Sequence, residues 1–443
     1  MAWLEQAMAA HGRGQVAEAE ALYLQVLREA GEQPDALHLL GVLNAQQGRL
    51  AQARALIERA IDLNPAEAMF HNNLGNVCAE AGALLEAETH YLHALELDGR
   101  RVDALNNLGV LLSHRGDVNG AESVLQRVLE LAPDFRDASQ NLASHHLRHG
   151  NMVRAVEACV GGLLIAPRNR ALRRMLGMAY TMLGQHTQAI QLYECWLQDE
   201  PGNAIAQHHL AAAQAQALAE GQLSGVAVSV PERAADGYVA QVFDTFARSF
   251  DERLSQLGYR APGLVGDTLA ALLPPPEGRL AVLDAGCGTG LCAPWLRPHA
   301  ASLVGVDLSS GMLGQAKQRG GYDELVCAEL VAYLLTQPQR FDALVSADTL
   351  CYFGALHGFA HAAWQAVRPG GVLVFTVEAL TSDAAGPGYQ LGGHGRYSHS
   401  ATYLRRVLTE AGWLGVDLVA EVLRSECGEA VHGWVVSARR ATN

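Results

Sequence analysis

The chain has 443 residues, more than one hydrophobic core usually organises, so we expect at least two domains. Hydrophobic residues make up 49% of it and charged residues 18%, a composition typical of globular and not of disordered proteins. The formal net charge of −14 argues against an extended surface for nucleic acid or anionic membrane, because both partners need clustered lysine and arginine.

The cysteines and the apolar segments restrict the class further. The eight cysteines form no Cys-x-x-Cys pair, so we expect reduced thiols and no zinc or disulfide framework. Residues 1–15 show no basic segment followed by an apolar one, and no apolar run is long enough to cross a membrane. The sequence therefore predicts a cytoplasmic protein without a signal peptide or a membrane span.

The first half of the chain is an internal repeat with a step of 34 residues. A Leu-Gly or Leu-Ala pair begins at positions 40, 74, 108, 142, 176 and 210, and a glycine recurs at positions 48, 82, 116, 150 and 184. The period and the small residues resemble the tetratricopeptide repeat (TPR), whose unit is a pair of closely packed helices. We expect five full units between residues 34 and 203 and a capping helix near 204–219. A degenerate unit precedes them, with Gly14, Ala19 and Tyr23 at the repeat positions.

Stacked repeats form a superhelix with a concave face, and a row of asparagines is predicted to lie on that face. The row consists of Asn72, Asn73, Asn106, Asn107 and Asn141. An amide both donates and accepts, so such a row can pair with an extended peptide backbone without reading its side chains. It resembles the row in the TPR groove of O-linked N-acetylglucosamine transferases, which implies a protein or peptide partner. Solvated polar side chains on an exposed face are the alternative.

A linker and a second domain follow the repeats. Glycine, serine and proline break the helical period over residues 220–236. From 237 to 443, short apolar runs alternate with helical stretches, which predicts a parallel α/β sheet after the all-α domain of residues 1–219. Strands are expected within residues 280–284, 301–307, 324–330, 341–353 and 367–378, and a hairpin of two final strands within 413–440.

The most specific motif of the second domain is "LAVLDAGCGTG", residues 280–290. Its glycines permit a tight turn from strand to helix and a close approach of a ligand to the backbone. Their spacing is G-x-G-x-G and differs from the G-x-G-x-x-G of a dinucleotide site. The next strand ends at Asp307, an acid suited to accept hydrogen bonds from both hydroxyls of a ribose.

In their order, these motifs resemble the class I S-adenosylmethionine (SAM) dependent methyltransferases over residues 236 to 440. The whole plan resembles bacterial methyltransferases that carry TPR repeats. The resemblance implies a Rossmann-like domain with a seven-stranded, mostly parallel sheet whose last strand is antiparallel. It also implies SAM as the cofactor, S-adenosylhomocysteine as the product and no metal.

The resemblance assigns SAM contacts position by position. The implied residues are Tyr238, Phe246, Asp284, Gly286, Gly288, Gly290, Asp307, Leu308, Glu329, Leu330, Ala347 and Asp348. The glycine loop and its acid would hold the methionine end, Asp307 the ribose, and Glu329 the adenine amine. The last two residues of the set would form the floor under the sulfonium.

The segment "YVAQVFDTFARSFDERL", residues 238–254, resembles the FDxxAxxFD cap helix of methyltransferases that act on small molecules. Its aromatic residues recur at near-helical spacing. They are expected to pack on the domain, to form a lid over SAM in which Tyr238 reaches the carboxylate of SAM, or to do both. Tyr238 and Phe246 are the candidates among them.

The loop "GGHGRYSHS", residues 392–400, follows the fifth strand, and substrates of this fold bind beyond the carboxyl ends of the strands. We therefore interpret Arg396, Tyr397 and His399 as candidate catalytic residues, with Arg396 as a clamp for a carboxylate or phosphate and His399 as a general base. An exposed surface turn is the alternative.

Neither histidine pair of the sequence predicts a metal site. His394 and His399 of the loop are too few ligands, and His145 and His149, four residues apart, have no evident third partner.

Three functional hypotheses remain open. The first is a SAM-dependent methyltransferase that acts on an oxygen or nitrogen nucleophile and recruits a protein through its TPR arm. The second is a methyltransferase for a small acidic metabolite that uses the repeats only for assembly. The third is a non-catalytic interaction scaffold that binds SAM. The fourth strand lacks the Pro-Pro-Tyr and Pro-Cys runs of base-methylating enzymes, so nucleic acid is not an expected substrate.

Overall fold

The computed structural model describes residues 2–223, 230–380, 387–426 and 429–442. The chain forms two compact units, residues 1–175 and 176–443. No helix in these ranges is both long and apolar enough to cross a membrane.

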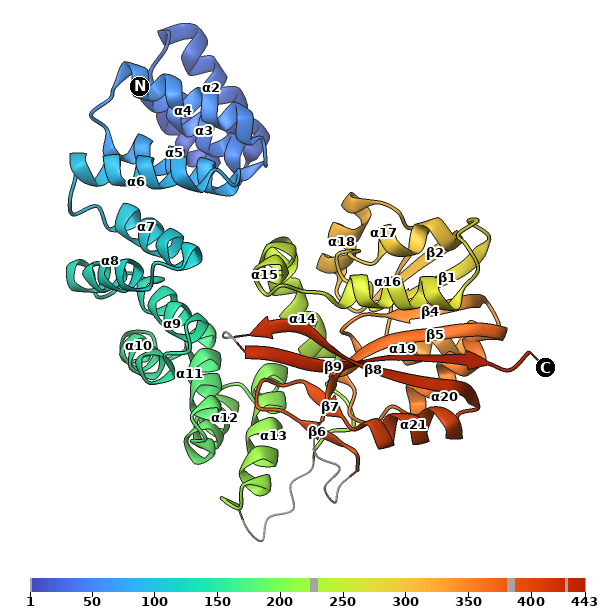
Figure 1. Ribbon diagram of the computed structural model, residues 1–443. Coiled ribbons are helices and arrows are strands. Elements are labelled where there is room, and N and C mark those ends of the chain that lie inside the picture. Colours follow the sequence, from blue (N-terminus) through green and yellow to red (C-terminus); the bar gives the residue numbers. More distant parts are fainter. Residues whose placement is uncertain (1, 224–229, 381–386, 427–428, 443) are drawn as a thin grey trace. The chain divides into compact units, whose positions relative to one another are not determined.

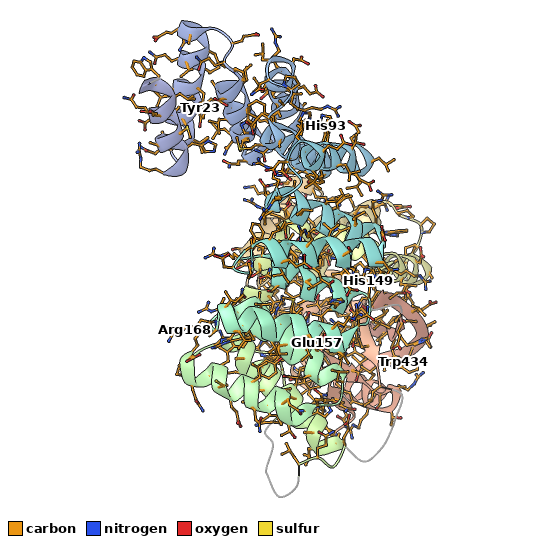
Figure 2. All side chains as sticks on the ribbon, turned by 90° about the vertical axis from the view of Figure 1, so that its left-hand side faces the viewer. Tyr23, His93, His149, Glu157, Arg168 and Trp434 are labelled. Carbon is orange, nitrogen blue, oxygen red and sulfur yellow. The ribbon has the colours of Figure 1, made fainter. Side chains whose placement is uncertain are left out.

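The first unit consists of paired antiparallel helices (Figure 1). They are α1 (Ala2–Gly12), α2 (Val16–Ala30), α3 (Pro34–Gln46), α4 (Leu50–Leu63), α5 (Ala68–Glu80), α6 (Leu84–Leu97), α7 (Val102–Arg115), α8 (Val118–Leu131), α9 (Ala138–Arg148), α10 (Met152–Ile165) and the first part of α11 (Arg170–Met182). The degenerate first pair is a full structural member, since Tyr23, labelled in Figure 2, is completely buried with Leu40 and Leu43. The repeat pattern therefore predicted the helices of this unit correctly.

The small residues of the repeat lie where the two helices of a pair cross. A Cβ at Gly75 of α5 would come within 2.5 Å of the ring of Tyr91 on α6, and a Cβ at Gly109 of α7 within 2.7 Å of Leu125 on α8. The turn after each first helix needs a left-handed backbone, as at Gly116 with φ of 83°. Small residues therefore recur every 34 residues because each helix pair repeats the same close contact.

We expect Gly75→Ala to lower the free energy of unfolding by about 1–3 kcal/mol, because the added methyl group overpacks the contact with Tyr91. Gly161→Ala is the matched control, since Gly161 is an exposed glycine of α10 with open space where a Cβ would lie. That control should gain about 0.5–1 kcal/mol from helix propensity. Thermal melting of the full chain measures both, and equal stability of the two variants would contradict the packing argument.

The second unit contains the remaining helices and one mixed sheet. Its strands are β1 (Leu280–Ala285), β2 (Ala300–Asp307), β3 (Glu324–Cys327), β4 (Phe341–Ser346), β5 (Val367–Ala379), β6 (Tyr389–Leu391), β7 (Tyr397–His399), β8 (Trp413–Glu426) and β9 (Glu429–Arg440). Strands β3, β2, β1, β4 and β5 are parallel neighbours in that order, while β9 pairs antiparallel with β5 and with β8. This arrangement confirms the predicted Rossmann-like class.

Within the described ranges the sheet has nine strands, so the predicted count of seven is wrong by two. The additional strands are β6 and β7, which form a hairpin with Tyr389 opposite His399. A tight turn closes the hairpin, with Gly395 at φ of 83° and the N–H of Gly392 donating to the carbonyl of Arg396 at 2.8 Å. β7 then adds to the far end of β5, where Glu378 pairs with Ser398.

Two apolar cores cover the two faces of the sheet, because adjacent strand residues point to opposite sides. Val282 belongs to the core under α16, and Leu283 belongs to the core under α19, α20 and α21. The helical elements of this unit are α12 (His186–Asp199), α13 (Ala204–Ala219), α14 (Asp236–Phe246), η1 (Ala247–Ser249), α15 (Phe250–Gln256), α16 (Ala261–Leu272), α17 (Ala293–Leu296), η2 (Arg297–His299), α18 (Ser310–Arg319), α19 (Leu330–Leu335), η3 (Leu350–Tyr352), α20 (His357–Ala366) and α21 (Ala401–Glu410).

The last helix of the repeats, α13, packs within this second unit (Figure 1). His208 Nε2 lies 2.8 Å from the carbonyl oxygen of Gly395, and the amide of Gln216 donates to the carbonyl of Leu391 at 2.7 Å. The ring of Tyr238 at the start of α14 stacks on His208 with centroids 4.0 Å apart. The β6–β7 hairpin therefore rests on a TPR helix.

Three local expectations differ from the structure. The segment expected as a single cap helix over 238–254 is two helices, α14 and α15, separated by the short 3-10 turn η1. Glu329 was expected at the end of the third strand, but β3 ends at Cys327 and Glu329 is the N-cap of α19. Within the expected linker, the N–H of Ala234 donates to the carbonyl of Tyr352 at 2.8 Å, while residues 224–229 lie outside the described part.

Candidate functional site

A cavity of about 230 Å³ lies at the carboxyl edge of the parallel strands. Its walls come from the loops after β1, β2, β3 and β4, from α14 and α15, and from β8. Of the expected SAM contacts, the lining includes Gly286, Gly288, Asp307, Leu308, Glu329, Leu330, Ala347 and Asp348. Parallel pairing brings these residues together, because the carboxyl ends of neighbouring strands meet at one edge.

The glycine loop after β1 gives a ligand access to the backbone. Gly286, Gly288 and Gly290 all have left-handed φ values, of 77°, 53° and 87°. A Cβ at Gly286 would collide with Thr349, whereas a Cβ at Gly288 would meet nothing within 4 Å. Gly288 is thus the point at which a ligand can approach the chain, and Gly290 supports the turn from outside the lining.

Asp307, at the end of β2, is held in place before any ligand arrives. Its Oδ2 accepts from the N–H of Gly288 at 2.9 Å and its Oδ1 from the N–H of Ser309 at 2.8 Å. Burial raises the pKa of this carboxyl above its ordinary value, and the backbone hydrogen bonds partly offset that rise. Each oxygen keeps a second lone pair for a donor on a ligand.

Asp284, at the end of β1, lies directly behind the loop. It is 1% exposed, and its Oδ2 accepts from the hydroxyl of Tyr322 at 2.6 Å. Its Oδ1 has no hydrogen-bond partner among the described residues. Burial raises its pKa to about 7, against the lowering effect of Tyr322. A buried carboxylate oxygen without a partner is costly, so this atom suits a ligand that brings a donor.

Glu329 reaches the cavity from the start of α19. Its two carboxylate oxygens cap the helix by accepting from the N–H groups of Val331 and Ala332 at 3.1 and 2.7 Å. Arg233 Nη1 lies 3.5 Å from Oε1. Leu330, the next residue, presents an apolar side chain to the cavity.

The aromatic wall differs from the expected one. Phe243 and Phe250 line the cavity, with ring centroids 5.8 Å apart. Tyr238 and Phe246 do not line it, since Tyr238 is buried against His208 and the guanidinium of Arg253 covers the ring of Phe246 at 4.5 Å. Because η1 separates α14 from α15, the two helices do not share one helical periodicity. Helical spacing along the sequence therefore could not predict which aromatic side chains line the cavity.

A cluster of five ionisable side chains, named here the Arg424 cluster, forms one end of the cavity. Its members are Asp348, Glu378, Arg396, Arg424 and Glu426. Arg424 uses Nη1 for Asp348 Oδ2 at 2.5 Å, Nε for Glu426 Oε1 at 2.6 Å and Nη2 for Glu378. Arg396 pairs with Glu378 and Glu426, each at 2.6 Å.

The two guanidinium groups control the acidity of the cluster. Burial raises the pKa of Glu426, but Arg396 and Arg424 outweigh it and bring the pKa to about 2. Glu378 also has a pKa below its ordinary value, because Arg396, His394 and Arg424 outweigh the effect of burial. Both carboxyls are therefore ionised near neutral pH. The sequence reading identified only Arg396 and Asp348 of this set, since Arg424 and Glu426 stand on a terminal strand with alternating charges.

The other candidates of the loop 392–400 are not brought to the cavity. His399 is fully buried, with Nε2 3.1 Å from the carbonyl oxygen of Gly354, and its own carbonyl accepts from the indole of Trp434, labelled in Figure 2, at 3.2 Å. Tyr397 is also fully buried and donates to the carbonyl of Pro231 at 2.7 Å. His394 is exposed, 3.4 Å from Glu378.

Burial makes His399 a stability element that depends on pH. It lowers the pKa of His399 to about 4, against an ordinary value of 6.5. As the pH falls, the imidazole of His399 is protonated near pH 6.5 in the unfolded chain but only near pH 4 in the folded one. The free energy of unfolding is therefore fully retained above pH 6.5 and falls as the pH drops from about 6.5 to about 4.

We expect wild type to lose about 2 kcal/mol of unfolding free energy through this histidine between pH 7 and pH 5, at about 1.4 kcal/mol per pKa unit. His399→Gln should remove that part of the pH dependence, whereas His361→Gln, at an exposed position, should retain it. Urea unfolding at the two pH values measures the difference. The same pH dependence in both variants would mean that His399 is not held neutral.

The asparagine row of the repeats lies on the first helices of consecutive pairs. Asn107 Nδ2 donates to Asn72 and Asn76 at 3.0 and 2.9 Å, and Asn141 Nδ2 donates to Asn106 at 2.8 Å. Asn73 Nδ2 is 2.8 Å from His38 Nε2. The amides therefore link neighbouring repeats. Asn72 and Asn106 are buried, while Asn73, Asn107 and Asn141 keep partly exposed surface.

Histidines also lie near this row, on α9 and in the turn that follows it. His145 is buried with Nδ1 2.9 Å from the hydroxyl of Ser113, and its ring lies 4.8 Å from that of His149. Across the described ranges, no group of three or more His, Cys, Asp or Glu side chains is arranged to hold a metal ion.

Family comparison assigns both halves of the chain. Residues 283–375 match the family model described as a methyltransferase domain, and residues 4–67 and 65–134 match two tetratricopeptide-repeat models. The chain combines tetratricopeptide repeats with a methyltransferase domain. This confirms the predicted combination, and the glycine loop and Asp307, which line part of the cavity, lie within the matched methyltransferase segment.

Among curated proteins, the chain is similar to human methyltransferase-like protein 27, with 36% identity over 143 residues, which are 32% of this chain and 58% of that protein. It is also 36% identical over 117 residues to the malonyl-[acyl-carrier protein] O-methyltransferase of Enterobacter lignolyticus, over 26% of this chain and 45% of the relative. The chain thus spans about half the length of these relatives.

Two solved structures are among those that resemble parts of the chain. PilW, a type IV pilus biogenesis factor, has a TM-score of 0.43 and 18% identity, over 46% of this chain and 95% of PilW. A SAM-dependent methyltransferase of Thermotoga maritima, described as a possible histamine N-methyltransferase, has a TM-score of 0.35 and 16% identity, over 46% of this chain and 99% of that one.

Proposed function

We propose that the protein transfers a methyl group from SAM to an oxygen or nitrogen nucleophile, and that its repeats recruit a protein or peptide. The observation that carries the first part is the cavity in which the glycine loop, Asp307 and Glu329 converge within a methyltransferase domain. The seven described cysteines are free thiols, which fits a reducing compartment such as the cytoplasm.

The residues of the cavity fit SAM group by group. The open backbone at Gly288 suits the methionine end of SAM, and the buried carboxyl of Asp284 lies behind this loop, outside the cavity lining. Asp307 offers a fixed carboxylate to the ribose hydroxyls, and Glu329 with Leu330 offers an acceptor and an apolar side to the adenine. Bound there, SAM supplies a methyl group made electrophilic by its sulfonium.

The chain's own contribution to the transfer is alignment in a site with little water. Phe243 and Phe250 form an apolar wall, and the ring of Phe243 meets that of Tyr352 in the loop after β4 with centroids 5.5 Å apart. Holding the acceptor in line with a fixed methyl group removes the entropy cost of a bimolecular encounter, which accounts for much of the rate in such reactions. We assign no catalytic contact to Tyr397 or His399, because both are buried outside the cavity.

Asp307→Ala should reduce the affinity for S-adenosylhomocysteine by roughly 100-fold or more, because two charge-assisted hydrogen bonds of about 1.5–3 kcal/mol each are lost. Asp267→Ala, an exposed acid on α16, is the matched control and should bind as wild type does. Titration calorimetry measures both. Equal affinities in the two variants would refute the ribose assignment.

The repeats support the second part of the proposal. The exposed edges of Asn73, Asn107 and Asn141 form a row of amides fixed by bonds between repeats. Such a row is suited to pair with the backbone of an extended segment. If the repeats served only for assembly around a small acidic metabolite, this row would carry no part of the reaction.

Replacing Asn73, Asn107 and Asn141 together by alanine should lower methylation of protein in a lysate roughly tenfold, at about 0.5–1.5 kcal/mol per lost hydrogen bond. The affinity for S-adenosylhomocysteine should not change. Asn119→Ala, at an exposed position on α8, controls for the loss of an amide. Circular dichroism verifies that the triple variant remains folded.

Undiminished protein methylation in the folded triple variant would favour the assembly alternative. A non-catalytic scaffold would instead bind S-adenosylhomocysteine and transfer no methyl group to protein, nucleic-acid or metabolite fractions.

A further inference from the structure

Among the described residues, the guanidinium of Arg424 has no nitrogen left for an acceptor, and Arg396 is paired through Nε and Nη2. Every nitrogen of Arg424 that carries hydrogen is paired with a carboxylate, and Arg396 is bound by both Glu378 and Glu426. The cluster holds three carboxylates against two guanidinium groups. An incoming carboxylate would add a fourth negative charge in a region where Arg424 is only 3% and Glu378 only 6% exposed. This end of the cavity therefore suits a neutral or cationic group.

Asp348 is the member of the cluster with unused capacity. Its Oδ2 pairs with Arg424, but its Oδ1 is buried and has no hydrogen-bond partner among the described residues. Asp348 lines the cavity, beside Ala347 and Thr349. This oxygen is therefore an unsatisfied hydrogen-bond acceptor, which a donor on a ligand could satisfy.

The backbone fixes Asp348 in an uncommon conformation. Its φ is 57°, in the left-handed region that non-glycine residues rarely adopt. Its N–H donates to the hydroxyl of Thr376 on β5 at 2.8 Å. A strained residue held by hydrogen bonds from two strands has a defined direction, and such residues concentrate at functional sites.

Burial also raises the proton affinity of Asp348. It lifts the pKa of this carboxyl above its ordinary value, although Arg424 acts in the opposite direction. Asp348 therefore differs from Glu378 and Glu426 of the same cluster, whose pKa values are lowered.

We propose that Oδ1 of Asp348 binds and deprotonates the methyl acceptor, which is therefore an amine or a hydroxyl group and not a carboxylate. This inference rests on the proposed methyl transfer. The lone pair of the acceptor forms the new bond to the methyl carbon as the bond from that carbon to sulfur breaks. Sulfur keeps the electron pair, and the proton of the acceptor passes to Oδ1. Arg424 is a positioning residue that holds the opposite oxygen.

The first test uses ligand binding alone. Sinefungin carries an amine where SAM carries the transferred methyl group, whereas S-adenosylhomocysteine has no group there. With the full-length protein, Asp348→Asn should weaken sinefungin at least tenfold and change the affinity for S-adenosylhomocysteine less than twofold. Asp267→Asn, an exposed control on α16, should leave both affinities as in wild type.

The outcomes separate the two proposals. Equal effects of Asp348→Asn on both ligands, or no effect on either, would overturn the role of Asp348 while leaving SAM binding intact. Failure of wild type to bind S-adenosylhomocysteine at all would instead overturn the proposed function itself.

The second test uses unmodified protein and needs no variant to fold. Tritiated methyl groups transferred to lysate components are treated with mild alkali, which hydrolyses methyl esters to volatile methanol and leaves N-methyl and ether products intact. We expect the label to stay with the non-volatile fraction. Release of most of the label as methanol would identify a carboxylate acceptor and refute the inference.

Discussion

The buried pairing of Arg424 with three carboxylates is the interaction on which the site depends most. It joins the loop after β4, the end of β5 and the last residues of β8, which are far apart in the sequence. Removing one partner of such a buried pair typically costs about 3–5 kcal/mol, since the remaining charges lose their compensation. The cluster thus fixes one end of the cavity, as the backbone donors around Asp307 fix the other.

Much of this arrangement was predictable because it follows from local rules. A fixed 34-residue step of small residues requires a repeated contact between helices, and the structure places Gly75 and Gly109 at those contacts. Likewise, the glycine loop and Asp307 stand at the ends of parallel strands, so topology alone brings them to one edge. The family resemblance added the identity of the ligand to these geometric expectations.

The parts that the sequence did not reveal depend on tertiary contacts. His399 looked available as a base, yet the β6–β7 hairpin turns it inward against Gly354. Strands of three residues leave almost no periodic signal, so that hairpin was not expected. Arg424 stands in a strand where it resembles a solvent-facing residue. It is buried because β8 pairs with β9, which in turn pairs with β5. For Phe243 and Phe250, the interruption at η1 sets the direction of the rings.

The packing of the β6–β7 hairpin on α13 limits where the chain can be divided without exposing apolar surface. Leu391 and Tyr397 of the hairpin are buried together with Ala212 of α13, in an apolar cluster that neither sequence half completes by itself. A gene that exchanged its repeat array by recombination would have to cut the chain before α12 and α13, or expose that cluster to water. Helices α12 and α13 therefore belong to the folding unit of residues 176–443, although they continue the helical repeat.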